Sequence, residues 1–198
     1  MSDFKNNQVM YEREPAKRVF AAELRESVKT IKDSTDEKSP TYLLLPTGER
    51  CNRIMFAGAL TDKSKAGDQN IMYRAKVSDP TGIFYINASS YQPEAMLQLA
   101  QIDADSPSFV VVVGKPNAYT TPEGKVLISV RAEAVQVVDR ETRDLWVVDA
   151  ARATLERVEA MFGADSASLP DAVMARATYQ QTAEHWKRVV FDALSKMV

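Results

Sequence analysis

Alternating polar and apolar positions near the middle of the chain predict a strand with two different faces. Across Asn70–Ser78, apolar Ala75 and Val77 alternate with cationic Arg74 and Lys76. Successive side chains of a strand point to opposite faces, so one face of this strand is apolar and the other is cationic. The apolar face indicates a protein core, and the cations opposite it indicate a charged ligand.

The residues that follow predict a tight turn and a second strand. The sequence DPTG at 79–82 has Pro at the second turn position and Gly at the fourth, where a β-turn favours them. Ile83–Ala88 then resumes the alternation, with Phe84 and Ile86 on one face and Tyr85 on the other. We therefore expect a hairpin, and we place it at the centre of the fold.

Further apolar segments predict a small barrel around this hairpin. A helix is expected at Pro93–Ile102, which has apolar residues at helical spacing behind Pro and Glu. Lysine-bearing Thr61–Gln69 and turn-rich Pro116–Lys125 are expected to be loops. The order β-β-β-α-β-β with these two loops is that of a five-stranded oligonucleotide/oligosaccharide-binding (OB) barrel. The expected strands are Arg53–Leu60, Asn70–Ser78, Ile83–Ala88, Ser108–Lys115 and Val126–Val138.

Helical patterns at both ends of the chain predict appendages to this barrel. The sequence REPAKRVFAAELRESVKTIK, at 13–32, has apolar residues at helical spacing, and its early Pro suits a first helical turn. Thr142–Phe162 and Asp171–Val198 are expected to form a C-terminal helical hairpin. The predicted fold is mainly β with appended helices. Its expected parts are an N-terminal helix and loop at 1–40, the barrel at 41–139 and a helical assembly region at 140–198.

The residue types offer little for catalysis or metal binding. The chain of 198 residues has one cysteine, Cys51, and one histidine, His185. This excludes an intrachain disulfide and the usual His/Cys zinc sites. The sequence has no P-loop, GxSxG, HExxH or GxGxxG motif. We expect a protein that is not an enzyme and that has no metal and no small-molecule cofactor.

The overall charge restricts how the chain can meet nucleic acid. The formal net charge is −2, so no global basic field attracts a polyanion, and binding must use a local patch. The N-terminal residues lack the apolar run of a signal peptide, and no run is long enough to span a bilayer. We expect a cytoplasmic protein without membrane contact.

Binding of a single strand requires cations along the backbone track and aromatic faces on which bases stack. Strand alternation places Arg74 and Lys76 beside Tyr85 on the expected ligand face, between the two expected loops. The alternatives are an ordinary solvated sheet face for the two cations and a half-buried strand position for Tyr85. The nucleic-acid candidates are Lys63, Lys65, Arg74, Lys76, Tyr85, Asn87, Tyr119 and Arg131.

The C-terminal region has a coiled-coil-like stripe of apolar residues at alternating spacings of three and four. The stripe can pack back on the barrel, or it can dock with helices of other subunits. Because the predicted barrel is already complete without these helices, we favour docking. The expected partner contacts are Leu145, Val148, Leu155, Phe162, Tyr179, Trp186 and Val190.

Three segments resemble a known family. REPAKRVFAAEL at Arg13–Leu24, PTGERCNRIMFAGAL at Pro46–Leu60 and YRAKVSDPTGIFYINASSYQPEA at Tyr73–Ala95 are similar to the archaeal replication protein A-associated proteins. The resemblance implies an OB-fold subunit of a single-stranded DNA-binding complex that acts in replication, recombination and repair. It implies single-stranded DNA and replication protein A subunits as partners, the latter through the C-terminal helices.

Two functions follow from these observations. The first is a non-enzymatic OB-fold subunit that holds single-stranded DNA on the hairpin face. The alternative is a protein-interaction subunit that stabilises a partner DNA-binding protein without touching DNA. The near-neutral charge and the few aromatic candidates favour this alternative.

Overall fold

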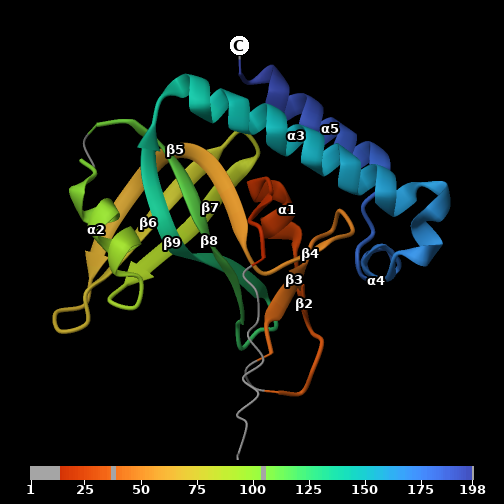
Figure 1. The fold of residues 1–198 in the computed structure, drawn as a ribbon, viewed down its shortest axis with the longest axis horizontal. Helices are drawn as coiled ribbons and strands as arrows, with labels where there is room; N and C mark the ends of the chain where they lie inside the picture. The colour runs from red at the N-terminus through yellow and green to blue at the C-terminus, as the bar shows by residue number, and fades with distance from the viewer. Residues whose placement is uncertain (1–13, 37–38, 104–105, 198) are drawn as a thin grey trace, which may run out of the picture.

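Five strands form the body of the protein, whose computed structural model describes residues 14–36, 39–103 and 106–197. Hydrogen bonding joins the strands in the order β5-β6-β7-β9-β8, and β8 pairs again with β5 to close a barrel (Figure 1). Of the pairings between these described strands, only that of β7 with β9 is parallel. The strands are β5 (Ile54–Ala66), β6 (Met72–Asp79), β7 (Gly82–Ser89), β8 (Ser108–Thr120) and β9 (Val126–Val138).

A helix between the third and fourth barrel strands completes the OB topology. This helix, α2 (Pro93–Gln101), buries Ala95 and Leu99 against the barrel. Inside the barrel the rings of Phe56 and Phe84 stack with centroids 3.8 Å apart. The predicted fold class, a five-stranded OB barrel with helices at both ends, is confirmed.

The β6–β7 turn caps the short N-terminal helix α1 (Ala21–Glu26). The Asp79 carboxylate accepts a hydrogen bond from the Ala21 N–H at 2.8 Å, and Thr81 Oγ1 accepts one from the Ala22 N–H at 3.0 Å. The first N–H groups of a helix have no partner inside the helix, so the turn satisfies two of them. Burial raises the pKa of the Asp79 carboxyl, and the hydrogen bonds that the carboxyl accepts oppose this rise.

Replacing Asp79 with alanine is expected to lower the free energy of unfolding by about 2–3 kcal/mol, because both a turn and a helix cap lose their acceptor. Asp79→Asn keeps one acceptor oxygen and should cost less. The midpoint of urea unfolding measures both changes. Equal midpoints for Asp79→Ala and the wild type would show that the turn does not hold the helix.

The N-terminal helix is much shorter than the sequence pattern predicts. Arg13, the first residue of the predicted helix, lies outside the described residues, and Lys17–Arg18 form the two-residue strand β1 beside β5. Downstream of α1, Lys29–Lys32 form β2. Here β-branched Thr30 and Ile31 pair with the next strand, and this tertiary pairing overrides the helical spacing.

A separate three-stranded sheet lies beside the barrel, in the order β2-β3-β4. Its other strands are β3 (Thr41–Leu44) and β4 (Arg50–Cys51). The apolar residues Leu43 and Leu44 thus belong to this small sheet and not to the barrel. Leu43 and Cys51 are buried in the main core, so the small sheet is packed against the barrel.

The C-terminal region has one long helix followed by a broken one. Helix α3 (Arg140–Phe162) is followed by the 3-10 turn η1 (Ala164–Ser168), α4 (Pro170–Thr178) and α5 (Ala183–Ser195). The second predicted helix is thus two helices. Tyr179 leaves the helical conformation, and its hydroxyl donates a hydrogen bond to the Leu44 carbonyl at 2.7 Å. Thr182 then caps α5 by accepting from the His185 N–H.

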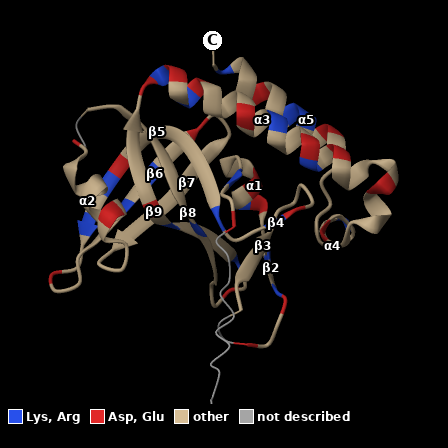
Figure 2. Cartoon of the chain, viewed as in Figure 1, with Lys and Arg blue, Asp and Glu red and all other residues tan. Residues whose placement is uncertain are grey.

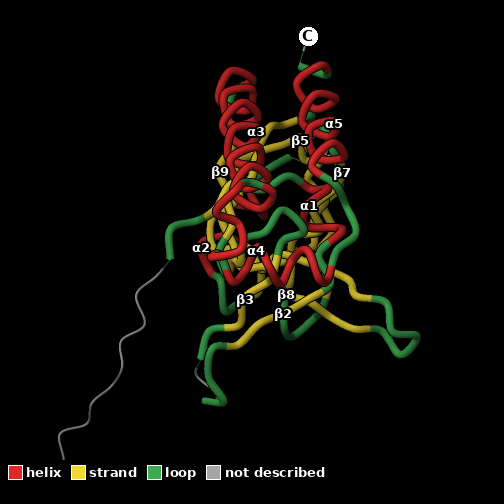
Figure 3. Tube along the Cα trace, turned by 90° about the vertical axis from the view of Figure 1, so that its right-hand side faces the viewer, coloured by secondary structure: helices red, strands yellow, loops and turns green. Residues whose placement is uncertain are grey.

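One face of this helical region packs back on the barrel. Helices α3 and α5 lie side by side over the barrel in both views (Figures 1 and 3). Trp146, Val147 and Val190 belong to the same core cluster as the barrel strands. This face therefore packs on the barrel, which is the first of the two alternatives for the helices. Within the described ranges, every helix is too short or too polar to cross a lipid bilayer.

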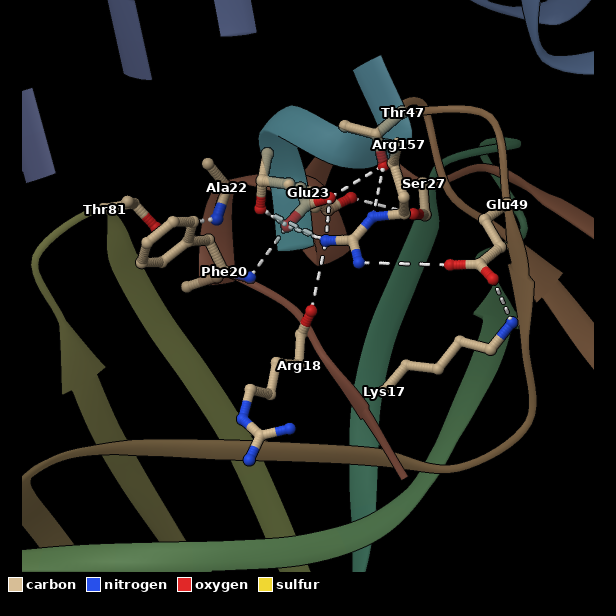
Figure 4. A network of polar contacts seen from close by, with 12 residues as sticks. Lys17, Arg18, Phe20, Ala22, Glu23, Ser27, Thr47, Glu49, Thr81 and Arg157 are labelled. Carbon is tan, nitrogen blue, oxygen red and sulfur yellow. Dashed lines mark hydrogen bonds and ion pairs between the residues drawn. The ribbon is translucent and has the colours of Figure 1, made fainter. Parts of the chain in front are cut away.

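A buried ion pair joins α1 to α3. Arg157 Nη2 lies 2.9 Å from Glu23 Oε1, and the two side chains are 8% and 0% exposed (Figure 4). The hydroxyl groups of Thr47 and Thr154 donate hydrogen bonds to the Glu23 carboxylate at 2.7 and 3.0 Å. The charge is therefore both paired and hydrogen-bonded, as a buried carboxylate requires.

Candidate nucleic-acid interface

A groove crosses the outer face of β6, β7 and β9. It consists of three depressions with volumes of about 470, 360 and 810 Å³. The first and third share Tyr85 and Ser129, and the first and second share Asn87. The three depressions therefore form one continuous surface, which we call the barrel groove.

Strand register brings a row of polar side chains across the barrel groove. Arg74 on β6 lies opposite Asn87 on β7, Asn87 lies opposite Arg131 on β9, and Arg131 lies opposite Lys115 on β8. With adjacent strands about 4.8 Å apart, the row is roughly 14 Å long. We call these four residues the cationic row. Arg74 and Arg131 are exposed, and neither forms an ion pair with a described residue.

An aromatic and apolar end lies beside the cationic row. Tyr85 and Tyr119 are 53% and 58% exposed, so both side chains are accessible to solvent. Tyr119 lies opposite Leu127 across the β8–β9 hairpin. Leu127 and Ile83, together with both tyrosines, line the largest of the three depressions that make up the barrel groove. The groove thus combines the cationic row with a second part in which aromatic and aliphatic side chains lie beside Arg25 and Lys125.

The charge of the barrel groove is strongly positive although the chain as a whole is slightly acidic. Among the described residues that line it, Asp62 is the only carboxylate. Asp62 Oδ2 lies 2.9 Å from Lys76 Nζ, so this one lysine is already paired. The lining cations are Arg25, Arg74, Lys76, Lys115, Lys125 and Arg131.

The structure brings together six of the eight residues that the sequence nominated. Two nominated lysines do not line the barrel groove, because the expected loop at 61–69 is mostly strand and β5 continues to Ala66. Lys63 donates hydrogen bonds to the Leu99 carbonyl at 2.9 Å and to the Ile102 carbonyl, so it satisfies the end of α2. Lys65 is exposed and lies opposite Tyr73. The six residues of the groove are Arg74, Lys76, Tyr85, Asn87, Tyr119 and Arg131.

Sequence reasoning did not nominate several groove residues. Leu127 and Ser129 share the strand face of Arg131, so their alternation contained a signal for them. Ile83 precedes Tyr85 by two residues and lies on the same face. Arg25 comes from α1 and reaches the groove only through tertiary packing, so no local pattern identifies it.

A larger depression of about 970 Å³ lies between α3 and the N-terminal segment. Its cations already face carboxylates: Lys17 pairs with Glu49 at 2.6 Å, and Arg50 pairs with Asp171 at 2.6 Å. The hydrogen bond to Asp171, together with that to Asp33, raises the pKa of the Arg50 guanidinium, and burial opposes this rise. Because its charges are balanced internally, this depression is a poorer anion site than the barrel groove.

Cys51 lies in the core and is fully buried. Burial raises the pKa of its thiol to about 12, so the thiol stays protonated at neutral pH. Within the described ranges, no group of three His, Cys, Asp or Glu side chains is placed to hold a metal ion.

The residues nominated for partner contact divide into two groups. Tyr179, Trp186 and Val190 are buried in the chain's own core, so this fold does not offer them to a partner. The other four are exposed on α3, where acidic and basic residues are mixed along the helix (Figure 2). We call these four the α3 stripe: Leu145, Val148, Leu155 and Phe162.

Comparison with known proteins gives structural similarities only. No protein-family model and no curated protein matches the sequence. The crystal structure of yeast Stn1 and Ten1 is similar with 12% identity and a TM-score of 0.43, over 55% of this chain and 55% of that chain. This match therefore spans about half the length of that chain.

Two smaller proteins are also similar. The mitochondrial single-stranded DNA-binding protein Rim1 of S. cerevisiae has 11% identity and a TM-score of 0.35, over 44% of this chain and 94% of Rim1. The N-terminal domain of PriB from Thermoanaerobacter tencongensis has 14% identity and a TM-score of 0.32, over 44% and 97%. The OB assignment rests on the strand order and closure of this chain itself.

Proposed function

We propose that the protein is a non-enzymatic OB-fold subunit that holds single-stranded DNA in the barrel groove. The observation that carries the proposal is the cationic row beside the exposed rings of Tyr85 and Tyr119. Phosphates lie along the row, and bases stack on the rings, because every base has a flat face and the stacking is tolerant of sequence. This local patch provides the attraction that a net charge of −2 does not.

The proposal extends to the assembly in which the subunit works. The resemblance of three sequence segments to the archaeal replication protein A-associated proteins supports a replication protein A-type complex in replication, recombination and repair. The α3 stripe would then contact another subunit, because its four apolar side chains are exposed along one long helix. The site of action is the cytoplasm.

Fluorescence anisotropy of labelled oligo-dT with the isolated protein tests direct DNA binding. The three cations of the cationic row, Arg74, Lys115 and Arg131, each neutralise one phosphate, so the logarithm of the binding constant should fall with the logarithm of salt concentration at a slope of about −2. No binding at low salt, or a slope near zero, would contradict the proposal.

A second candidate function is a protein-interaction subunit that never contacts DNA. The slight net negative charge and the small number of exposed rings in the groove favour it. It predicts no anisotropy change with the isolated protein and binding only after a replication protein A subunit is added. Purification of that complex and measurement of its mass would then give the stoichiometry.

A further inference from the structure

Asp62, a carboxylate that lines the barrel groove, has an unusual position. Strands β5 and β6 pair with a register shift between Leu60 and Asp62, so Asp62 takes the place opposite Lys76 that Thr61 would hold in a regular ladder. Such a bulge adds one residue to a strand and changes where its side chains point. As a result, the Asp62 carboxylate and the Lys76 ammonium lie 2.9 Å apart.

Both members of this pair are exposed, so both can exchange partners with the solvent. The ion pair lowers the pKa of the Asp62 carboxyl and raises the pKa of the Lys76 ammonium, so both groups are charged at neutral pH. A phosphate that reaches β6 therefore meets a lysine that is already neutralised and a negative charge beside it. By contrast, Arg74 two residues earlier has no such competitor among the groove-lining residues.

We propose that Asp62 competes with the phosphates of the strand for Lys76. Asp62 holds the lysine and must release it before the lysine can bind the strand. The inference rests on the proposed function, because it concerns the affinity of the same groove. Asp62 then makes the Lys76 contact conditional, lowers the affinity for polyanions and speeds their release. It also follows that Lys76 contributes less to binding than Arg74, although the two side chains lie on one face of one strand.

The test is the binding of fluorescein-labelled oligo-dT at low salt to the full chain carrying Asp62→Asn. We expect affinity to rise about five- to tenfold, and the slope against salt to become steeper by about 0.7, because one more cation engages a phosphate. The matched control is the exposed Asp192→Asn on α5, which changes the net charge equally but lies outside the groove. The control should bind like the wild type.

Lys76→Ala in both backgrounds shows whether Asp62 acts through the lysine. In the wild type this substitution should change affinity less than it does in the Asp62→Asn background, because the lysine is already paired with Asp62. In the Asp62→Asn background it should remove most of the gain. If Asp62→Asn tightens binding equally with and without Lys76, the effect is simple repulsion and the competitor role is wrong.

The outcomes also separate this inference from the proposed function. If Asp62→Asn binds like the wild type while Arg74→Ala weakens binding, the competitor is overturned and DNA binding in the groove stands. If neither the wild type nor Asp62→Asn binds the strand, both proposals are overturned. Melting temperatures of all variants should match, because the substituted side chains are exposed.

Discussion

Replacing Arg157 with methionine is expected to lower the free energy of unfolding by about 3–5 kcal/mol, because the substitution leaves a buried carboxylate without its counter-ion. Glu23 is fully buried, and Arg157 Nη2 reaches both of its carboxylate oxygens, at 2.9 and 3.1 Å. The side chain of methionine fills part of the space but offers no donor. Denaturant unfolding followed by circular dichroism measures the loss as a lower midpoint at unchanged slope.

A second arginine on the same helix provides the control. Arg152 is exposed and pairs with Asp149 at 3.7 Å, so Arg152→Met should cost about 0.5 kcal/mol or less. Combining Glu23→Gln with Arg157→Met removes both charges and should recover part of the loss. Equal midpoints for Arg157→Met and Arg152→Met would contradict the structural role of the pair. Alkylation of Cys51, which is buried in the folded state, provides an independent measure of unfolding.

Combining Tyr85→Ala with Arg74→Ala is expected to weaken oligo-dT binding more than any other change in the barrel groove. Loss of one stacked base costs about 1–3 kcal/mol, which corresponds to roughly five- to 150-fold in affinity. Loss of Arg74 removes one phosphate contact and should reduce the salt slope by about 0.7. Anisotropy titrations at several salt concentrations measure both effects.

Conservative variants show which property of each side chain matters. Tyr85→Phe keeps the ring and should bind like the wild type, and Arg74→Lys keeps the charge and should keep the salt slope. Lys65→Ala removes an exposed lysine of β5 that lies outside the groove, so it should have little effect. If the double variant binds like Lys65→Ala, the strand does not occupy this face.

The central hairpin was predictable because one of its faces is buried. Val77, Phe84 and Ile86 are buried while Tyr85 is exposed between them, and this contrast produces a clear period of two. The nominated residues on β6 and β7 therefore line the groove as expected. The residues that alternate with buried neighbours, and so lie on the outer face, could be identified from the sequence alone.

The continuation of β5 was not predictable by the same reasoning. Beyond Leu60 its side chains are half-buried or exposed on both faces, so no alternation distinguishes the strand from a loop. The sequence therefore predicts that Lys63 lies in a loop. In the structure Lys63 instead donates hydrogen bonds to carbonyl groups at the end of α2. That contact depends on the three-dimensional approach of two elements far apart in the sequence.

In the C-terminal helices, spacing identified apolar faces but not what covers them. Trp186 packs with Ala22 and Val158 of the same chain, whereas Phe162 at the end of α3 remains exposed. Both have the helical periodicity of a packed side chain. The N-terminal segment shows the related limit, since its helical spacing continues past Glu26 but pairing with β3 makes Lys29–Lys32 a strand.

The buried ion pair also restricts the order in which the chain can complete its folding. Glu23 and Arg157 are separated by 134 positions, so ribosomal synthesis makes the carboxylate long before the guanidinium. Until the second group arrives, docking of α1 would bury an uncompensated charge. Closing so long a loop is also an entropically late event. We therefore expect α1 to be among the last elements to dock, after α3 has been made.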